Sequence, residues 1–420
     1  MNRRSFSAVR KTLIGLVLFS AIFGWVLMAI NTVGLAQQVL TPATVPTAAA
    51  TSVVPTSVAL FSPTSSAAPI FPDVSSAGAA QTPAVHPKTG RYIAAWLPDS
   101  FSGENRKSFE ENADIIDEVS PFWYTPTAGG GLQFGQDARD MTLVELAHSK
   151  NVLVIPSVHN VVNGVDPVPA LLRNPDARQL HIRNIVNEVL AYNYDGFDID
   201  FEALDTSLRA EYTAFVTDLA AALHEHEKIL TIAVHAKTSD YGGLGGFQDW
   251  PALGKVVDRL RIMTYDYHWR GGGPGPVAPV YWVSEVAEYA SSVVDPSKVI
   301  IGVPFYGYNW PLGGGEAYGQ TWNIINDIIR SRGLTVNLQE SDAGREVQEN
   351  WITYNGREVW FSTSRGLEAK ISLVQRLDLA GIAIWRLGGE DPQNWTVIRN
   401  KLAQDPFESQ RSINRVLPEP

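Results

Sequence analysis

Residues 195–202 constrain this chain more than any other segment, because their sequence, DGFDIDFE, alternates apolar and acidic residues from Phe197 onward. Successive side chains of a β-strand point to opposite faces of its sheet. One face holds Phe197, Ile199 and Phe201, and the other holds Asp198, Asp200 and Glu202. The segment therefore predicts a strand that packs on apolar partners on one side and directs three carboxylates into an interior on the other.

Seven further apolar runs are strand candidates, and helical patterns lie between most of them. With the acidic strand, taken as 196–202, the candidates are 92–97, 119–124, 152–159, 229–236, 260–267, 299–306 and 381–387. The clearest helical pattern places Tyr212, Phe215, Val216 and Leu219 on one face. Eight strand–helix units predict an α/β fold, the (β/α)8 TIM barrel, over residues 89–404. An open, doubly wound sheet is the alternative.

The interval between the seventh and eighth candidate strands is longer than the others. It contains two strand-like runs, at 351–354 and 358–361, and an apolar helix face made by Ile324, Ile325, Ile328 and Ile329. We expect a small α+β insertion at residues 311–363, between strand 7 and strand 8.

The first 36 residues have the pattern of an export signal. Basic residues from Arg3 to Lys11 precede an uncharged, mostly apolar run at 12–30, and the end of the segment, Gly34 to Ala36, offers a small-residue cleavage site. The run is also long enough to span a bilayer. A signal peptide and a signal anchor, with residues 12–30 as a membrane tether, both remain open. The basic flank predicts an extracellular or cell-surface location in either case.

Two further segments are expected to lie outside the folded domain. Residues 37–88 are rich in Pro, Ala, Thr and Ser, a composition typical of a flexible, disordered linker. Residues 405–420 are expected to form a loose C-terminal tail.

Charge and cysteine content narrow the classes of partner. The 420 residues carry a formal net charge of −11, which argues against nucleic-acid binding and fits a neutral polysaccharide. The absence of cysteine excludes disulfides, cysteine metal ligands and a cysteine nucleophile. We expect a monomer that needs no cofactor and no metal.

Three carboxylates on the inner face of a buried strand should raise one another's pKa, so that one stays protonated near neutral pH. A protonated carboxyl is what a glycosidase uses to protonate a leaving oxygen. Glu202 comes last on the strand, nearest the C-terminal mouth where barrel active sites lie, and is the candidate acid. The alternatives are a solvated edge strand and a calcium site. The bulky residues between the acids argue against both.

The octapeptide resembles the D-G-x-D-x-D-x-E signature of family 18 glycoside hydrolases, the chitinase-like enzymes. Met263 to Asp266 resembles the family's M-x-Y-D, Gly302 to Gly307 its strand-seven motif, and Trp385 its strand-eight tryptophan. The resemblance implies a retaining, substrate-assisted hydrolase of β-1,4-linked N-acetylglucosamine polymers, either peptidoglycan or chitin.

The same resemblance implies a role for each residue. Glu202 would be the acid and then the base, and Asp200 would bind the acetamido N–H with support from Asp198. Tyr265 would donate to the acetamido oxygen, and Trp385 would form the floor of the sugar site. The remaining expected substrate contacts are Asp266, Tyr124, Tyr306 and Trp269.

The sequence also departs from common chitinases, in which strand three often ends in S-x-G-G. Here it reads Ser157-Val158-His159-Asn160, which changes the wall beside the expected acetamido pocket. The stretch from Met263 to Trp269 is similar to the branch that contains bacterial spore-cortex peptidoglycan hydrolases. His268 in this stretch is expected to make a loop hydrogen bond. A non-hydrolytic, lectin-like protein is the alternative function, and the retained Glu202 argues against it.

Overall fold

The computed structural model describes residues 87–98, 103–160, 165–240 and 243–402. The expected signal segment and C-terminal tail, and nearly all of the expected linker, lie outside these residues. Within the described ranges, no helix combines the length and the apolar character needed to cross a membrane.

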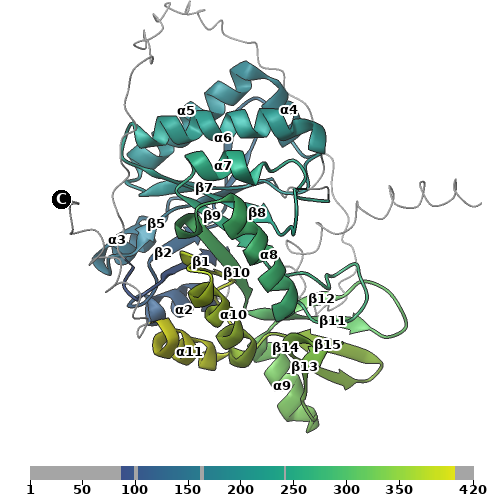
Figure 1. The fold of residues 1–420 in the computed structure, drawn as a ribbon. Coiled ribbons are helices and arrows are strands. Elements are labelled where there is room, and N and C mark those ends of the chain that lie inside the picture. Colours follow the sequence, from purple (N-terminus) through teal and green to yellow (C-terminus); the bar gives the residue numbers. More distant parts are fainter. Residues whose placement is uncertain (1–86, 99–102, 161–164, 241–242, 403–420) are drawn as a thin grey trace, which may run out of the picture.

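A curled sheet of eleven strands forms the centre of the molecule (Figure 1), in the order β4-β3-β6-β7-β8-β9-β10-β16-β1-β2-β5. Its pairs are parallel except for β3 with β4. The strands are β1 (Tyr92–Leu97), β2 (Glu118–Pro121), β3 (Tyr124–Pro126), β4 (Leu132–Phe134), β5 (Leu153–Val154), β6 (Ser157–His159), β7 (Gly196–Asp200), β8 (Ile229–His235), β9 (Arg259–Met263), β10 (Val299–Pro304) and β16 (Gly381–Trp385).

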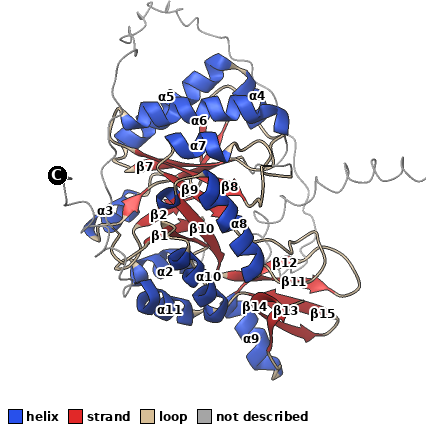
Figure 2. Ribbon diagram, in the orientation of Figure 1, coloured by secondary structure: helices blue, strands red, loops and turns tan. Residues whose placement is uncertain are grey.

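Helices lie around this sheet (Figure 2), and each of them has buried side chains. They are α2 (Glu104–Asn112), α3 (Met141–Ser149), α4 (Val168–Arg173), α5 (Pro175–Ala191), α6 (Arg209–His224), α7 (Trp250–Val256), α8 (Val280–Val293), α10 (Ser364–Arg376) and α11 (Pro392–Leu402). The predicted face of α6 is buried at Tyr212, Phe215, Val216 and Leu219. These side chains join one core cluster with the outward-facing residues of the strands. The predicted α/β class is therefore confirmed.

Closure of the barrel is not seen, because the ladder ends at β4 and β5. Two predicted strands are each broken in two. The second divides into β2 and β3 around Phe122 and Trp123, and the third divides into β5 and β6 around Ile155 and Pro156. Proline cannot donate to a ladder, and Pro121 and Pro156 lie at these breaks.

A second, five-stranded antiparallel sheet follows β10, in the order β12-β11-β15-β14-β13. Its elements are β11 (Tyr306–Pro311), β12 (Tyr318–Thr321), helix α9 (Trp322–Arg332), β13 (Asn337–Asp342), β14 (Arg345–Tyr354) and β15 (Arg357–Phe361). They gather at one side of the molecule in Figure 1. The seventh barrel strand thus ends at Pro304, and these elements begin at Tyr306, earlier than the expected residue 311.

Buried contacts join this second sheet to the rest of the fold. Glu349 on β14 is fully buried and accepts the main-chain N–H groups of Val277 and Ala278, each at 3.3 Å. Lys370 of α10 lies 3.5 Å from the same carboxylate. On α9, Ile325 is buried as the pattern predicts, but Ile324 is 47% exposed, so the apolar face is narrower than expected.

Candidate active site

Strand β7 carries the predicted alternation. Phe197, Ile199 and Phe201 are fully buried in the core cluster that includes the helices, while Asp198 and Asp200 belong to the opposite face. Gly196 opens the strand where β7 and β8 approach closely, and a Cβ there would lie 2.1 Å from the carbonyl oxygen of Ile229. The three acids are thus carried on the inner face of the curled sheet.

Asp198 is enclosed by hydrogen-bond donors and has no exposed surface. One oxygen, Oδ2, accepts from Ser157 Oγ at 2.6 Å and from Trp96 Nε1 at 3.2 Å, and Oδ1 accepts from Thr231 Oγ1 at 2.8 Å. The guanidinium of Arg261 lies 3.4 Å from Oδ1. With both oxygens occupied, Asp198 is placed to support the site and not to contact a ligand.

Arg261 on β9 is the counter-charge that the sequence reasoning missed. It is fully buried, pairs with Glu118 of β2 as well as with Asp198, and donates to Ser120 Oγ at 2.9 Å. Its guanidinium also lies 5.2 Å from the centre of the Trp96 ring. The interior therefore holds a bonded ionic network below the site, and not three carboxylates alone.

Asp200 lies one layer above this network and is 4% exposed. Its Oδ1 is buried without a hydrogen-bond partner among the described residues. Burial raises the pKa of Asp200 well above its usual range, and the nearby charges of Glu202 and Asp198 raise it further, while Arg261 opposes them. An unpaired buried oxygen is costly unless a ligand occupies it, so this oxygen is a candidate ligand contact.

Glu202 follows β7 by two residues, and its side chain is 29% exposed. Burial, and then the charge of Asp266, raise the pKa of Glu202 to about 7. A carboxyl in this range holds its proton near neutral pH and can still release it, as a general acid requires. Of the three acids, Asp200 and Glu202 thus have the raised pKa that the sequence predicted.

Tyr265 and Asp266 follow β9 at the same end of the sheet. Burial, and then the charges of Asp200 and Glu202, raise the pKa of Tyr265 well above its usual range. The ring fits because Gly302 has no side chain, where a Cβ would lie 2.8 Å from Tyr265 Cε1.

The hydroxyls of Tyr306 and Tyr308 both donate to Asp266, the second at 2.9 Å. Burial raises the pKa of Asp266 to about 6 despite these two bonds. Tyr306 itself is only 2% exposed, so it is placed to hold Asp266, whereas the sequence suggested a substrate contact.

Trp385 lies at the end of β16, and its ring centre is 5.8 Å from that of Trp96 and 5.1 Å from that of Phe122. Phe122 in turn stacks on His159 at 5.0 Å, and His159 is in register with Asp200 on the neighbouring strand. Trp385 is therefore brought together with the acidic residues. Phe122 and His159 belong to the same wall, although the sequence reasoning did not select them as site residues.

Tyr124 is not part of this site, and its expected substrate contact is wrong. The ring is fully buried against Phe197, on the helix side of the sheet. Its hydroxyl bonds Glu188 and Tyr194, each at 2.9 Å. The break at Phe122 and Trp123 reverses the alternation, so that Phe122 faces the interior instead.

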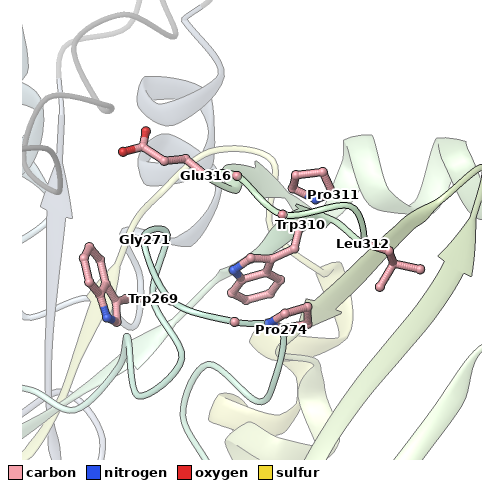
Figure 3. Close-up of a pocket in the computed structure, with 11 residues that line it drawn as sticks. Trp269, Gly271, Pro274, Trp310, Pro311, Leu312 and Glu316 are labelled. Atoms are coloured by element: carbon pink, nitrogen blue, oxygen red, sulfur yellow. The ribbon is translucent and has the colours of Figure 1, made fainter. Parts of the chain in front are cut away.

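Trp269 lines a separate cavity of about 450 Å³ between the loop after β9 and the loop after β11. Figure 3 shows Trp269 and Trp310 on either side of this pocket, with Glu316 at its edge. Trp310 packs on Tyr308 at 5.4 Å, which links the cavity wall to Asp266. Its buried Nε1 donates to no partner among the described residues.

His268 makes the expected loop hydrogen bond, from Nδ1 to the carbonyl oxygen of Gly273 at 2.9 Å. Among the described residues, no group of three or more His, Asp or Glu side chains is arranged to hold a metal ion.

Comparisons with known proteins identify the family of this chain. Residues 101–390 match the family model described as Glycosyl hydrolases family 18. The putative sporulation-specific glycosylase YdhD of Bacillus subtilis (strain 168) is 32% identical over 345 residues, which cover 78% of this chain and 79% of that protein. The cortical fragment-lytic enzyme of Bacillus anthracis is 29% identical over 252 residues, 59% of each chain.

Among solved structures, a chitinase from Chromobacterium violaceum ATCC 12472 superposes with a TM-score of 0.68 at 25% identity, covering 75% of this chain and 99% of that one. The family match covers more than half of the chain and includes the acidic strand, the tyrosine and aspartate after β9, and the whole of the second sheet. The chain therefore belongs to family 18 of the glycosyl hydrolases and is a glycosidase.

Proposed function

We propose that this glycosidase hydrolyses β-1,4-linked polymers that contain N-acetylglucosamine, with retention of configuration and with Glu202 as acid and then base. The observation that carries the proposal is the inner face of β7. There, Asp200 presents a buried, unpaired oxygen beside a Glu202 whose pKa is raised to about 7. The names of two similar proteins, a cortical fragment-lytic enzyme and a chitinase, fit a polymer of this class.

In the first step, the Glu202 carboxyl donates its proton to the glycosidic oxygen, and the bond from that oxygen to the anomeric carbon breaks. The carbonyl oxygen of the substrate's acetamido group attacks the anomeric carbon and forms an oxazolinium ring. In the second step, Glu202, now a carboxylate, takes a proton from water. The water oxygen then opens the ring at the same face from which the leaving group departed.

The other residues assist by position. The free Oδ1 of Asp200 accepts the acetamido N–H and stabilises the positive charge that develops on the ring. The charge of Asp198 helps to raise the pKa of Asp200. Tyr265 donates to the acetamido oxygen, and Trp385 forms the floor beneath the sugar. The negative charge of Asp266 adds to the effect of burial in raising the pKa of Glu202.

The cavity at Trp269 serves a sugar unit away from the bond that is cut. The half-buried indole of Trp269 offers an apolar face for a sugar ring, and Trp310 backs the cavity wall from within the core. A subsite here would bind long chains better than short ones.

In the deciding experiment, the full chain and its Glu202→Gln variant are each incubated with chitin and with peptidoglycan, and the products are identified by mass spectrometry. We expect products ending in N-acetylglucosamine from at least one polymer, inhibition by thiazoline analogues of the cyclised acetamide, and no products from Glu202→Gln. Equal digestion by the variant would refute the acid assignment. Binding without any cleavage by the parent chain would support the lectin-like alternative.

We also propose that the protein acts as a monomer outside the cytoplasm. The basic and then apolar pattern of residues 1–36 supports export, and residues 12–30 would tether the protein if they are not cleaved. Cell fractionation with N-terminal sequencing, and light scattering of the purified protein, test the two statements. Intracellular protein with an intact N-terminus, or a dimer mass, would contradict them.

We further propose that residues 153–159 close the sheet into the (β/α)8 barrel. The Ile155 N–H donates to the Val119 oxygen at 3.0 Å, and the Asp198 N–H donates to the Pro156 oxygen at 2.9 Å. One short segment thus bonds both β2 and β7. A crystal structure with a wide gap between these strands would refute closure.

A further inference from the structure

The main chain of Glu202 is held by a side chain and not by the sheet ladder. The last register pair between β6 and β7 joins His159 to Asp200, so Glu202 lies beyond it. The Glu202 N–H donates to Asn160 Oδ1 at 2.8 Å, and Asn160 Nδ2 donates to the Glu202 carbonyl oxygen at 2.9 Å. One carboxamide therefore replaces the main-chain partners that a longer β6 would have supplied.

The orientation of Asn160 is itself fixed. Its Nδ2 also donates to Asp166 Oδ2 at 2.8 Å, and Asp166 Oδ1 accepts the N–H of Val168 at the start of α4. Asn160 is buried, with 7% exposure. The Asn160 side chain thus links the start of helix α4, through Asp166, to the main chain of Glu202. A residue without a carboxamide at position 160 would make neither bond to Glu202.

A second side chain holds the next residue. Ala203 has a φ of 54°, a left-handed conformation that costs a residue with a side chain on the order of 1 kcal/mol or more. Its N–H donates to His235 Nε2 at 3.0 Å. The main-chain N–H of His235 donates to Gln248 Oε1 at 2.9 Å, which anchors the end of β8.

The bond to Ala203 requires an unprotonated Nε2. Burial lowers the pKa of His235 to about 4, so its ring is neutral at neutral pH and carries its hydrogen on Nδ1. The same Nε2 lies 3.9 Å from Glu202 Oε2, beyond hydrogen-bond distance. His235 therefore accepts from the main chain and leaves the Glu202 carboxyl free for the substrate.

We propose that Asn160 and His235 are positioning residues that hold the main chain at Glu202 and Ala203 and thereby aim the Glu202 carboxyl at the glycosidic oxygen. The inference rests on the proposed role of Glu202 as the acid. Proton transfer needs hydrogen-bond contact with the leaving oxygen, and a displacement of about 1 Å costs on the order of 100-fold in rate. Asn160 directly follows β6 and His235 ends β8, so the two side chains restrain the acid from the two sides of β7.

The test compares two leaving groups in the full chain. The variants are Asn160→Ala, His235→Ala and His235→Gln, with the exposed His226→Ala as a matched control. Each is assayed on the polymer, whose leaving sugar needs a proton, and on a dinitrophenyl glycoside of N-acetylglucosamine, whose leaving group departs without one. Thermal unfolding of each variant verifies that it is folded.

We expect both alanine variants to lose about 100-fold in kcat on the polymer with little change in KM. They should lose far less in kcat/KM on the dinitrophenyl glycoside, because kcat/KM reports only the steps up to departure of the leaving group and not the later step in which Glu202 acts as the base. His235→Gln should recover most of the rate, because its Oε1 can accept the Ala203 N–H. Asn160→Ala provides an independent test should His235→Ala not fold. His226→Ala should match the parent.

Equal losses of kcat/KM on the two substrates, parental rates in both alanine variants, or a His235→Gln variant no better than His235→Ala would each overturn the proposal. A failure of the proposed function looks different. In that case Glu202→Gln would itself retain polymer hydrolysis, whereas an inactive Glu202→Gln with unaffected Asn160→Ala and His235→Ala refutes only the positioning role.

Discussion

Replacing Glu202 by glutamine should stabilise the protein in a way that depends on pH. The pKa of Glu202 is raised from 4.5 to about 7, first by burial and then by the charge of Asp266. Below the lower value, the folded and unfolded chains both hold the proton. Between the two values, only the folded chain holds it, so stability is lost as pH rises until the folded pKa is passed.

The size of this loss follows from the shift. One pKa unit corresponds to about 1.4 kcal/mol, so the ionisation of Glu202 costs the folded state up to about 3 kcal/mol at alkaline pH. Glutamine at this position does not ionise and avoids that cost. The free energy of unfolding of Glu202→Gln should therefore equal that of the parent near about pH 4 and exceed it by up to about 3 kcal/mol near about pH 8.

The assay is urea unfolding followed by tryptophan fluorescence, repeated across that pH range. Glu145→Gln is the matched control for the loss of a carboxylate from the surface, because Glu145 is an exposed residue of α3. If the difference between Glu202→Gln and the parent is the same at every pH, then Glu202 has an ordinary pKa in the folded protein and the reasoning is refuted.

Four further predictions follow from other parts of the site. Replacing Arg261 by methionine removes the counter-charge of Glu118 and Asp198 and should lower the free energy of urea unfolding by about 3–5 kcal/mol; a loss no larger than that of Arg365→Met, at an exposed arginine of α10, would contradict the buried network. In the parent, kcat/KM should fall as pH rises through about 7, where Glu202 loses its proton; a flat profile there would contradict the acid role. Trp269→Ala should raise KM for the polymer and leave that for a short aryl glycoside unchanged, and equal changes would remove the proposed subsite. Tyr124→Phe should keep kcat and lower stability by about 1 kcal/mol, whereas a fall in kcat with unchanged stability would return Tyr124 to the active site.

The acidic face of β7 could be predicted from sequence because the two-residue period of a strand is a local property. It places Asp198 and Asp200 on one face whatever the rest of the chain does, and the apolar residues between them identify the buried side. The family motifs added Tyr265 and Trp385, which the structure brings to the same end of the sheet.

Tyr124 shows where this reasoning fails. Counting by twos from Ser120 places Phe122 and Tyr124 on the same face, but the break between β2 and β3 reverses the direction of Tyr124. The signal that could have revealed the break was Pro121, since proline interrupts a ladder. Tyr306 was misjudged for a related reason, because the chain leaves the first sheet at Phe305 and begins the second.

Arg261 and His235 could not be predicted, because their roles depend on contacts between strands that are distant in the sequence. Nothing local distinguishes Arg261 from a surface arginine, yet the curl of the sheet brings it beside Glu118, Asp198 and Thr231, which lie on three other strands. His235 is likewise defined only by the turn at Ala203. Local sequence patterns identified the reacting groups. The residues that set the charge and position of those groups could be identified only from the tertiary structure.

The most direct measurement of the central claim is the infrared difference spectrum between the parent protein and Glu202→Gln, titrated with pH. We predict a protonated-carboxyl band that is present in the parent near about pH 6, absent from the variant, and lost as pH passes about 7. A band that disappears near about pH 4, or no difference between the two proteins, would contradict the claim that the folded chain keeps a proton on Glu202.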